Sequence, residues 1–245
     1  MEEARRRTLH GRRSGKKLRA GQQSLLDAAL PRLAVALPAE AVVDAEGDVA
    51  ESVVKIDLAR LFGALPPGGV WLEIGFGAGE HLVWQAEHHP DVGLIGCEPY
   101  INGIAKCLAH IERTGISNVR IFSDDARLLM AALPPRSLSR VFVLFPDPWP
   151  KTRHHKRRFV ARRNLDVLAR LMRPGSELRL ATDDPSYLPW MVEHACTHPA
   201  FEWLAERAVD WRTRPGDWPP TRYEQKMLAG HKPAFLRLKR RPEGR

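Results

Sequence analysis

The chain has 245 residues, and its hydrophobic content of 44% is ordinary for a globular protein. It has no run of eighteen or more uncharged apolar residues and no secretory pattern, so we expect a cytoplasmic protein without a membrane span. The formal net charge of +9 favours negatively charged partners, nucleic acids above all.

The basic residues gather in blocks along the chain. Residues 5–19 contain eight Lys or Arg and no acid, and residues 151–163 contain seven and no acid. Such blocks bind polyphosphate backbones. For the N-terminal block alone, however, a solubilising tail is the favoured interpretation. We expect residues 1–50 to be a basic, partly disordered extension, with residues 1–20 disordered in isolation, and residues 51–245 to form one domain.

Strands and helices are expected to alternate through most of the chain. Residues 22–37 are expected to be partly helical, residues 38–50 are typical of a linker, and a helix is expected over 53–62, ending at Gly63. Strands are then predicted at 70–74, 92–98, 119–122, 140–145, 177–182 and 234–239, with helices at 81–89, 101–113, 125–132, 157–172 and 186–197. This alternation predicts an α/β fold with a mostly parallel, doubly wound sheet.

A glycine-rich turn follows the first predicted strand. Gly75, Gly77 and Gly79 form G-x-G-x-G, so the third glycine comes one residue too early for the dinucleotide pattern G-x-G-x-x-G. Glu73, at the end of the strand, would repel a pyrophosphate. It suits a cationic or neutral ligand better, such as the amino acid end of S-adenosylmethionine.

Further acids follow the next two strands. Glu98 lies about twenty residues beyond the glycines, where an acid accepts hydrogen bonds from both ribose hydroxyls. Asp124 and Asp125 follow the third strand, beside the expected position of an adenine. A helix N-cap or a solvated loop residue is the alternative for each acid taken singly. Together they predict a nucleoside pocket with an acidic rim.

The most specific feature is a proline-rich loop after the fourth strand, Phe145-Pro146-Asp147-Pro148-Trp149-Pro150-Lys151. Each proline fixes φ and removes a backbone donor, so the loop is stiff. It places a carboxylate, an indole and an ammonium at a strand end, where α/β proteins bind ligands. A rigid turn with a packed Trp is the plainer reading, but the basic run that follows indicates a nucleic acid substrate.

These motifs resemble those of the bacterial tRNA (guanine-N7)-methyltransferase family, in family order over about residues 50 to 240. The matching segments are Glu73–Glu80, Gly96–Tyr100, Phe145–Lys151, His155–Arg158, Ala181–Asp183 and Thr221–Lys226. The resemblance implies a Rossmann-like class I methyltransferase fold, whose last strand inserts antiparallel. It also implies S-adenosylmethionine as cofactor, tRNA as partner, and methylation of guanosine N7 at variable-loop position 46.

The resemblance also suggests roles for single residues. The cofactor set is Glu73, Gly75, Gly77, Glu98, Asp125 and Asp147, and the substrate set is Lys151, Asp183, Thr221, Arg222, Tyr223 and Glu224. The family has one acid before the alanine that follows the third strand; Asp125 is assigned to adenine, and Asp124 stays open. Thr221 and Glu224 also have capping-box spacing, so they also fit a helix start.

Guanine N7 carries a lone pair and no hydrogen, so no general base is needed to create the nucleophile. Asp147 is the candidate catalytic residue, because a carboxylate near the ring stabilises the cationic product. Hydrogen bonding to the guanine Watson–Crick edge is the alternative, and Asp147 and Asp183 can divide the two tasks in either way. Lys151 is expected to hold a nucleotide phosphate or the guanine O6.

Cys97, Cys107 and Cys196 lack metal-ligand spacing, so we expect reduced thiols and no metal site. The chain is expected to be a monomer or a homodimer. Two other functions stay open. One is a methyltransferase acting on another base, an RNA cap or a protein, although the N-P-P-Y loop typical of amino-group methylation is missing. The other is an RNA-binding protein without enzymatic activity.

Overall fold

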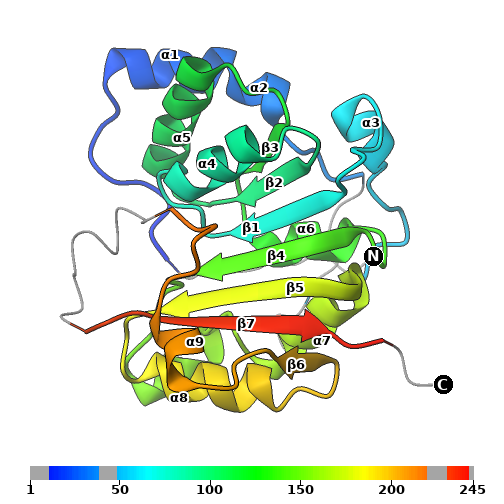
Figure 1. The fold of residues 1–245 in the computed structure, drawn as a ribbon. Helices are drawn as coiled ribbons and strands as arrows, with labels where there is room; N and C mark the ends of the chain where they lie inside the picture. Colours follow the sequence, from blue (N-terminus) through cyan, green and yellow to red (C-terminus); the bar gives the residue numbers. More distant parts are fainter. Residues whose placement is uncertain (1–10, 39–48, 220–230, 243–245) are drawn as a thin grey trace, which may run out of the picture.

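The computed structural model describes residues 11–38, 49–219 and 231–242, and these form a seven-stranded sheet with helices on both faces (Figure 1). The strand order is β3-β2-β1-β4-β5-β7-β6. Strands β1 to β5 pair in parallel, and β7 pairs antiparallel with β5 and β6. The strands are β1 Val70–Ile74, β2 Gly93–Cys97, β3 Val119–Phe122, β4 Leu138–Leu144, β5 Met172–Thr182, β6 Phe201–Trp203 and β7 Ala234–Arg240. The predicted fold class, with its antiparallel last strand, is confirmed.

The core consists of two apolar clusters, one on each face of the sheet. β1 and β2 are buried along their whole length, as expected for parallel strands covered on both sides. One cluster joins the sheet to α4 Glu80–His88 and α5 Ile101–Thr114. The other joins it to α6 Ala126–Ala132, α7 Arg162–Leu171 and α8 Tyr187–Met191, which continues as a π-helical turn, Val192–Cys196.

The direction of the strand order reverses at β1, which lies between β2 and β4: the chain builds β1, β2 and β3 toward one side of the sheet and β4 and β5 toward the other. The register pairs Ile74 with Cys97 on one side and with Val143 on the other. The glycine turn, Glu98 and the proline loop therefore all begin at the same edge of the sheet. In open α/β sheets, ligands bind at this topological switch point.

Five elements differ from the sequence-based expectation, three in their bounds and two because they were not expected. The helix expected over 53–62 is α3 Leu58–Phe62, because the Asp57 side chain caps it at Arg60 N; it ends at Gly63, which has φ 84°. The helix expected over 157–172 is preceded by a 3-10 turn, Thr152–Arg157, and begins only at Arg162. β5 begins at Met172, before the predicted residue 177. β6 and the short helix α9 Ala208–Arg212 were not predicted.

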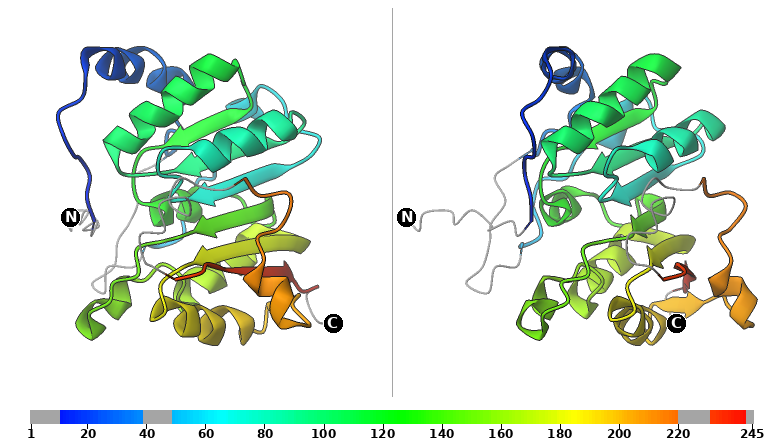
Figure 2. Two further views of the ribbon diagram at one scale, coloured as in Figure 1. Left: turned by 60° about the vertical axis from the view of Figure 1, so that its left-hand side comes forward. Right: turned by 90° about the vertical axis from the view of Figure 1, so that its left-hand side faces the viewer.

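The N-terminal residues that the structure describes pack against the domain (Figure 2). Helix α1 Ala20–Ala28 contacts α5, and α2 Leu30–Leu33 contacts β3. Beyond α2, the Val35 N–H donates to the Ile121 carbonyl at 2.8 Å. Within residues 11–20, expected to be disordered in isolation, Arg13, Gly15 and Lys16 form hydrogen bonds with the domain; this does not test the expectation for the isolated segment. The division at residue 50 stays a prediction.

Candidate cofactor and substrate site

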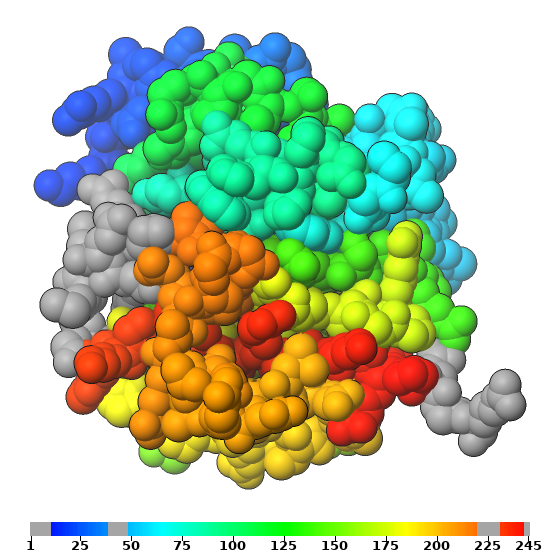
Figure 3. All heavy atoms as spheres, in the orientation of Figure 1, coloured from blue at the N-terminus to red at the C-terminus, as the bar shows by residue number. Residues whose placement is uncertain are grey.

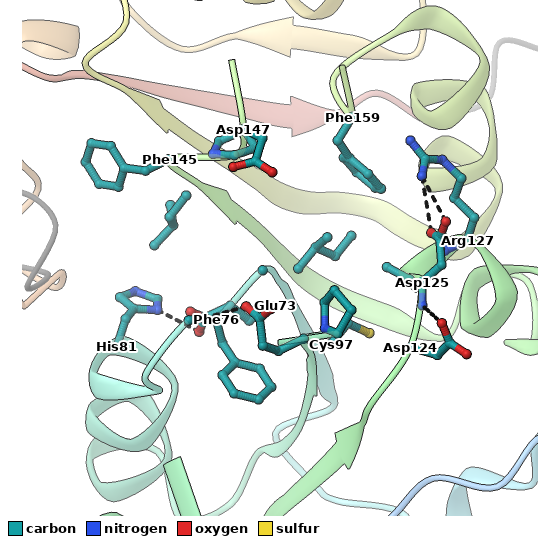
Figure 4. A pocket seen from close by; sticks show the side chains of 18 of the residues that line it. Glu73, Phe76, His81, Cys97, Asp124, Asp125, Arg127, Phe145, Asp147 and Phe159 are labelled. Carbon is teal, nitrogen blue, oxygen red and sulfur yellow. Dashed lines mark hydrogen bonds and ion pairs between the residues drawn. The ribbon is translucent and has the colours of Figure 1, made fainter. Parts of the chain in front are cut away.

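A cavity of about 510 Å³ opens at the carboxyl ends of the parallel strands (Figure 4). Loops after β1, β2, β3 and β4 line it, and its volume suits a nucleoside-sized ligand. Asp147 and Phe159 lie on one side, and Glu73 and Phe76 lie opposite them. Every residue of the predicted cofactor set lines this cavity: Glu73, Gly75, Gly77, Glu98, Asp125 and Asp147.

The glycine turn leaves room for a ligand. Gly75 and Gly77 have φ of 77° and 59°, in the left-handed region where glycine carries no steric cost. A Cβ added at either would meet no heavy atom within 4 Å. Gly79 differs, since a Cβ there would collide with Cys107 of α5. The third glycine thus packs two helices together, whereas the first two keep cavity space open.

Glu98 is buried at the end of β2 and is held by backbone amides. Its Oε2 accepts from the Gly77 N–H at 2.8 Å, and its Oε1 accepts from the Tyr100 N–H at 2.9 Å. Burial raises the pKa of this carboxyl, nearby Asp147 and Glu73 add to the rise, and the two amides oppose it. Each carboxylate oxygen accepts about two hydrogen bonds. The ionised group therefore keeps capacity for ligand hydroxyls.

Glu73 ends a buried hydrogen-bond chain that the sequence analysis missed. The His81 Nδ1 lies 2.8 Å from Glu73 Oε2, and its Nε2 lies 3.2 Å from the Gln85 side-chain nitrogen. That amide nitrogen also donates to the Asp217 carbonyl at 2.9 Å. Because an amide nitrogen only donates, His81 Nε2 accepts and its Nδ1–H donates to Glu73. His81 thereby fixes the orientation of a cavity carboxylate.

The signal for this chain was present in the sequence. A tight strand-to-helix turn brings the strand end at Glu73 close to the first turn of α4, where His81 lies. Gln85 follows His81 by four residues, the spacing that places two side chains on one helix face.

Asp217 and Trp218, among the last described residues before residue 220, lie beside α4 (Figure 3). Arg179 is buried and donates to Asp217 Oδ2 at 2.7 Å and to Glu177 Oε2 at 2.9 Å. Trp218 is buried against His81, Phe142 and Phe235. The four predicted substrate residues Thr221, Arg222, Tyr223 and Glu224 lie outside the described residues, directly after this anchor.

Two acids follow β3, and both line the cavity. Asp125 caps α6 by accepting from the Arg127 N–H at 3.0 Å, and it pairs with the Arg127 guanidinium at 3.1 Å. Asp124 Oδ1 accepts from the Asp125 N–H at 2.8 Å and pairs with Arg13, also at 2.8 Å. The capping alternative is thus realised at Asp125. Its contact with adenine stays a prediction.

The proline loop holds two residues in an unusual conformation. Phe145 and Trp149 have φ of 50° and 46°, which is uncommon for residues other than glycine. Arg158 braces the loop, since its Nε donates to the Pro148 carbonyl at 2.7 Å and its Nη2 to Ser186 Oγ at 3.0 Å. The guanidinium also lies over the rings of Tyr187 and Trp190.

Arg158 corrects the expectation that the whole run 151–163 contacts RNA. Its exposed fraction is 1%, so its guanidinium faces the protein interior. Lys151, Arg153 and Lys156 are exposed instead, and Arg157 is half-buried with its guanidinium 5.1 Å from the Trp149 ring centre.

The candidate catalytic and substrate residues lie in different places. The Asp147 side chain is exposed at the cavity, and the surrounding protein raises the pKa of its carboxyl by removing part of its hydration. Asp183 is buried at the end of β5 and, like Lys151, is not among the described residues that line the cavity. Of the three, only Asp147 is placed to face a ligand there.

The described residues contain no group of three or more His, Cys, Asp or Glu side chains arranged to hold a metal ion. Among the helices of this part of the chain, none has the length and apolar character needed to cross a membrane.

Comparison with known proteins points to methyltransferases. A family model described as "Putative methyltransferase" matches residues 68–236. A tRNA (guanine-N(7)-)-methyltransferase of Rhodospirillum rubrum is 50% identical over 234 residues, covering 95% of this chain and 88% of that protein. The enzyme of the same name from Paramagnetospirillum magneticum is 50% identical over 235 residues, covering 94% and 92%.

Solved structures share the fold at low identity. The 16S rRNA (adenine(1408)-N(1))-methyltransferase of Catenulisporales acidiphilia aligns with a TM-score of 0.53 at 14% identity, covering 80% of this chain and 96% of that one. The 16S rRNA methyltransferase KamB aligns with a TM-score of 0.52 at 18% identity, covering 83% and 100%.

Proposed function

The chain belongs to the tRNA (guanine-N7)-methyltransferase family, and from this premise we propose that it methylates N7 of a guanosine in tRNA with S-adenosylmethionine as methyl donor. The finer proposal is that the target is guanosine 46 of the variable loop. A single observation carries the function. The same cavity is lined by Asp147, on a loop that Arg158 holds in place, by the buried acceptor Glu98, and by a glycine turn that leaves space for a ligand.

The cavity fits S-adenosylmethionine by the chemistry of its groups. The ligand presents ribose hydroxyls and an ammonium, which are donors, and the cavity presents carboxylates at Glu73, Glu98 and Asp125. The space beside Gly75 and Gly77 is available for the ligand, since a Cβ added at either glycine would meet no other heavy atom within 4 Å. We assign these five residues to the cofactor. When bound, it supplies an electrophilic methyl group on a sulfonium.

The residues around Asp147 would bind and orient the guanine. N7 attacks with its own lone pair and the ring becomes cationic, so the protein needs to align the base and stabilise positive charge. Asp147 lines the cavity on a loop whose Pro148 carbonyl accepts a hydrogen bond from Arg158. An ionised carboxylate there can both align the base and stabilise its positive charge.

We further propose that Lys151, Asp183 and the segment Thr221–Glu224 bind the substrate. Support for the segment comes from its anchor. Asp217 is hydrogen-bonded to Arg179 and Gln85, which fixes the chain beside α4 shortly before this segment in sequence.

Product analysis tests the function. An unmodified tRNA transcript is incubated with methyl-labelled S-adenosylmethionine, digested to nucleosides and separated by chromatography. The expected product is 7-methylguanosine, and a transcript in which guanosine 46 is replaced by adenosine should stay unlabelled. Label in another nucleoside would overturn N7 chemistry. Label as 7-methylguanosine in the adenosine-46 transcript would overturn only the position.

A further inference from the structure

Residues 11–19 run as a basic strap along the carboxyl edge of the sheet (Figure 2), and Arg13 of the strap pairs with Asp124, which lines the cavity. The strap leads into α1 and contains Arg12, Arg13, Lys16, Lys17 and Arg19. A solubilising tail, the interpretation favoured by its composition alone, would have no fixed course. The contacts of the strap show otherwise.

The strap is pinned to the start of α5. Helix α5 lacks a side-chain cap from its N-cap residue, Tyr100, and the Arg13 carbonyl accepts the Ile101 N–H at 3.0 Å. The Asn102 amide bonds the strap in both directions, accepting from the Gly15 N–H and donating to the Lys16 carbonyl, each at 2.7 Å. The strap thus supplies an acceptor for the Ile101 N–H, one of the amides that the start of a helix leaves without an intrahelical partner.

The strap pairs with one acid that lines the cavity and passes near a second. The Arg13 guanidinium pairs with Asp124 at 2.8 Å. Two residues earlier, a Cβ added at Gly11 would lie 3.9 Å from Asp147 Oδ2, so the strap backbone passes directly beside the candidate catalytic carboxylate. It therefore runs from the adenine side of the cavity to the proline loop.

Its remaining charges face solvent. Arg12, Lys16 and Lys17 are exposed, and no ion pair with an acid of the described residues is found for them. Across the proline loop, the 3-10 turn carries exposed cations at Arg153 and Lys156. Two basic segments that are far apart in sequence therefore come close to the loop of Asp147: the strap, which passes near it at Gly11, and the 3-10 turn, which follows it in the chain.

We propose that the strap is one wall of the RNA-binding surface and contacts the phosphate backbone of the substrate beside the target nucleotide. This inference rests on the proposed function for the identity of the RNA. Because backbone and Asn102 hydrogen bonds hold the strap, the backbone that carries its cations is positioned before RNA arrives, and less ordering entropy opposes binding.

The salt dependence of tRNA binding tests the proposal. Lys16→Gln/Lys17→Gln removes two exposed charges, and Arg173→Gln/Lys239→Gln is the matched control. Both control residues are exposed. In the register of β5 and β7, Lys239 lies opposite Glu177, several residues before the end of β5 at which the cavity opens. If both strap lysines contact phosphates, the slope of log K against log salt should flatten by about 1.4–1.8, and affinity at 0.15 M salt should fall roughly tenfold. The control should bind as wild type. A strap variant that also matches wild type would overturn the proposal.

A second variant moves the strap without changing charge. A Cβ at Gly15 would lie 3.1 Å from Tyr100 Cζ and 3.3 Å from Asn102 Oδ1, so Gly15→Val should displace the strap from α5. We expect severalfold weaker tRNA binding, with faster hydrogen exchange at the Ile101 amide. Faster exchange with unchanged tRNA affinity would show that the strap's position is irrelevant to RNA.

Failure of this inference can be told from failure of the proposed function. Wild-type protein that forms 7-methylguanosine while the strap variant binds tRNA normally would remove the strap alone. If the wild-type protein forms no 7-methylguanosine but replacement of the strap lysines still weakens tRNA binding, the proposed activity is overturned and the RNA-binding surface is kept.

Discussion

Replacing Arg158 should destabilise the protein without changing the salt dependence of RNA binding. Arg158→Ala removes three hydrogen bonds from a buried guanidinium, at 2.7 Å to the Pro148 carbonyl, 3.0 Å to Ser186 Oγ and 3.3 Å to the Ser186 carbonyl. Hydrogen bonds to charged groups contribute roughly 1.5–3 kcal/mol each, so the loss of the two shorter bonds alone should cost about 3–6 kcal/mol. Arg158→Lys keeps the charge but cannot form the fork, and should lose about 2–3 kcal/mol.

Two assays separate the structural role from an RNA contact. Urea unfolding gives the free energy of unfolding, and tRNA titrations at several salt concentrations give the slope of log K. Lys156→Gln is the control, because Lys156 is an exposed cation of the same run. It should leave stability within about 0.5 kcal/mol and, if it contacts a phosphate, flatten the slope by roughly 0.7–0.9. An Arg158→Ala protein as stable as wild type, with a flattened slope, would refute the reasoning.

Three further predictions concern the cavity. Asp147→Asn should retain cofactor and most tRNA binding but slow single-turnover methyl transfer on the order of a hundredfold or more; added loss of discrimination between guanosine and inosine would assign it to the Watson–Crick edge, and near-normal rates would remove it from the mechanism. Glu98→Ala should weaken S-adenosylmethionine binding in calorimetry by about 1–3 kcal/mol. The folded pKa of Glu98 is raised by burial, and in the proposed role only its ionised form accepts both ribose hydroxyls, so wild-type affinity should decline as pH falls through that raised pKa, above the range of an ordinary glutamate; a decline only in the ordinary range would contradict this. His81→Ala leaves Glu73 without its donor and should weaken cofactor binding by about 1–3 kcal/mol, whereas His81→Asn should restore most of it; equal affinities of the two variants would rule out the hydrogen bond as the cause.

The fold and the cavity lining were predictable because both depend on strand ends. Apolar segments ending in Glu73, Glu98 and Asp125 place their acids at one edge once the sheet is parallel. That argument needs only the alternation of strands and helices and a count of residues. It does not depend on the rotamer of any side chain.

The role of Arg158 could not be predicted in this way. A run of cations does not tell which side chain turns inward, since the acceptors of Arg158 lie 10 and 28 residues away in sequence. The strap was missed for the same reason. Its partners, Asn102 and Asp124, come from a helix and a loop that only the fold brings near it.

Methyl transfer to tRNA containing 7-deazaguanosine tests the central claim most directly. This base keeps the Watson–Crick edge of guanine but has a C–H in place of N7, so it offers no lone pair to the methyl group. Wild-type protein should bind both transcripts alike and, in a single turnover, methylate only the guanosine transcript. Transfer to the 7-deazaguanosine transcript at a comparable rate would contradict the account.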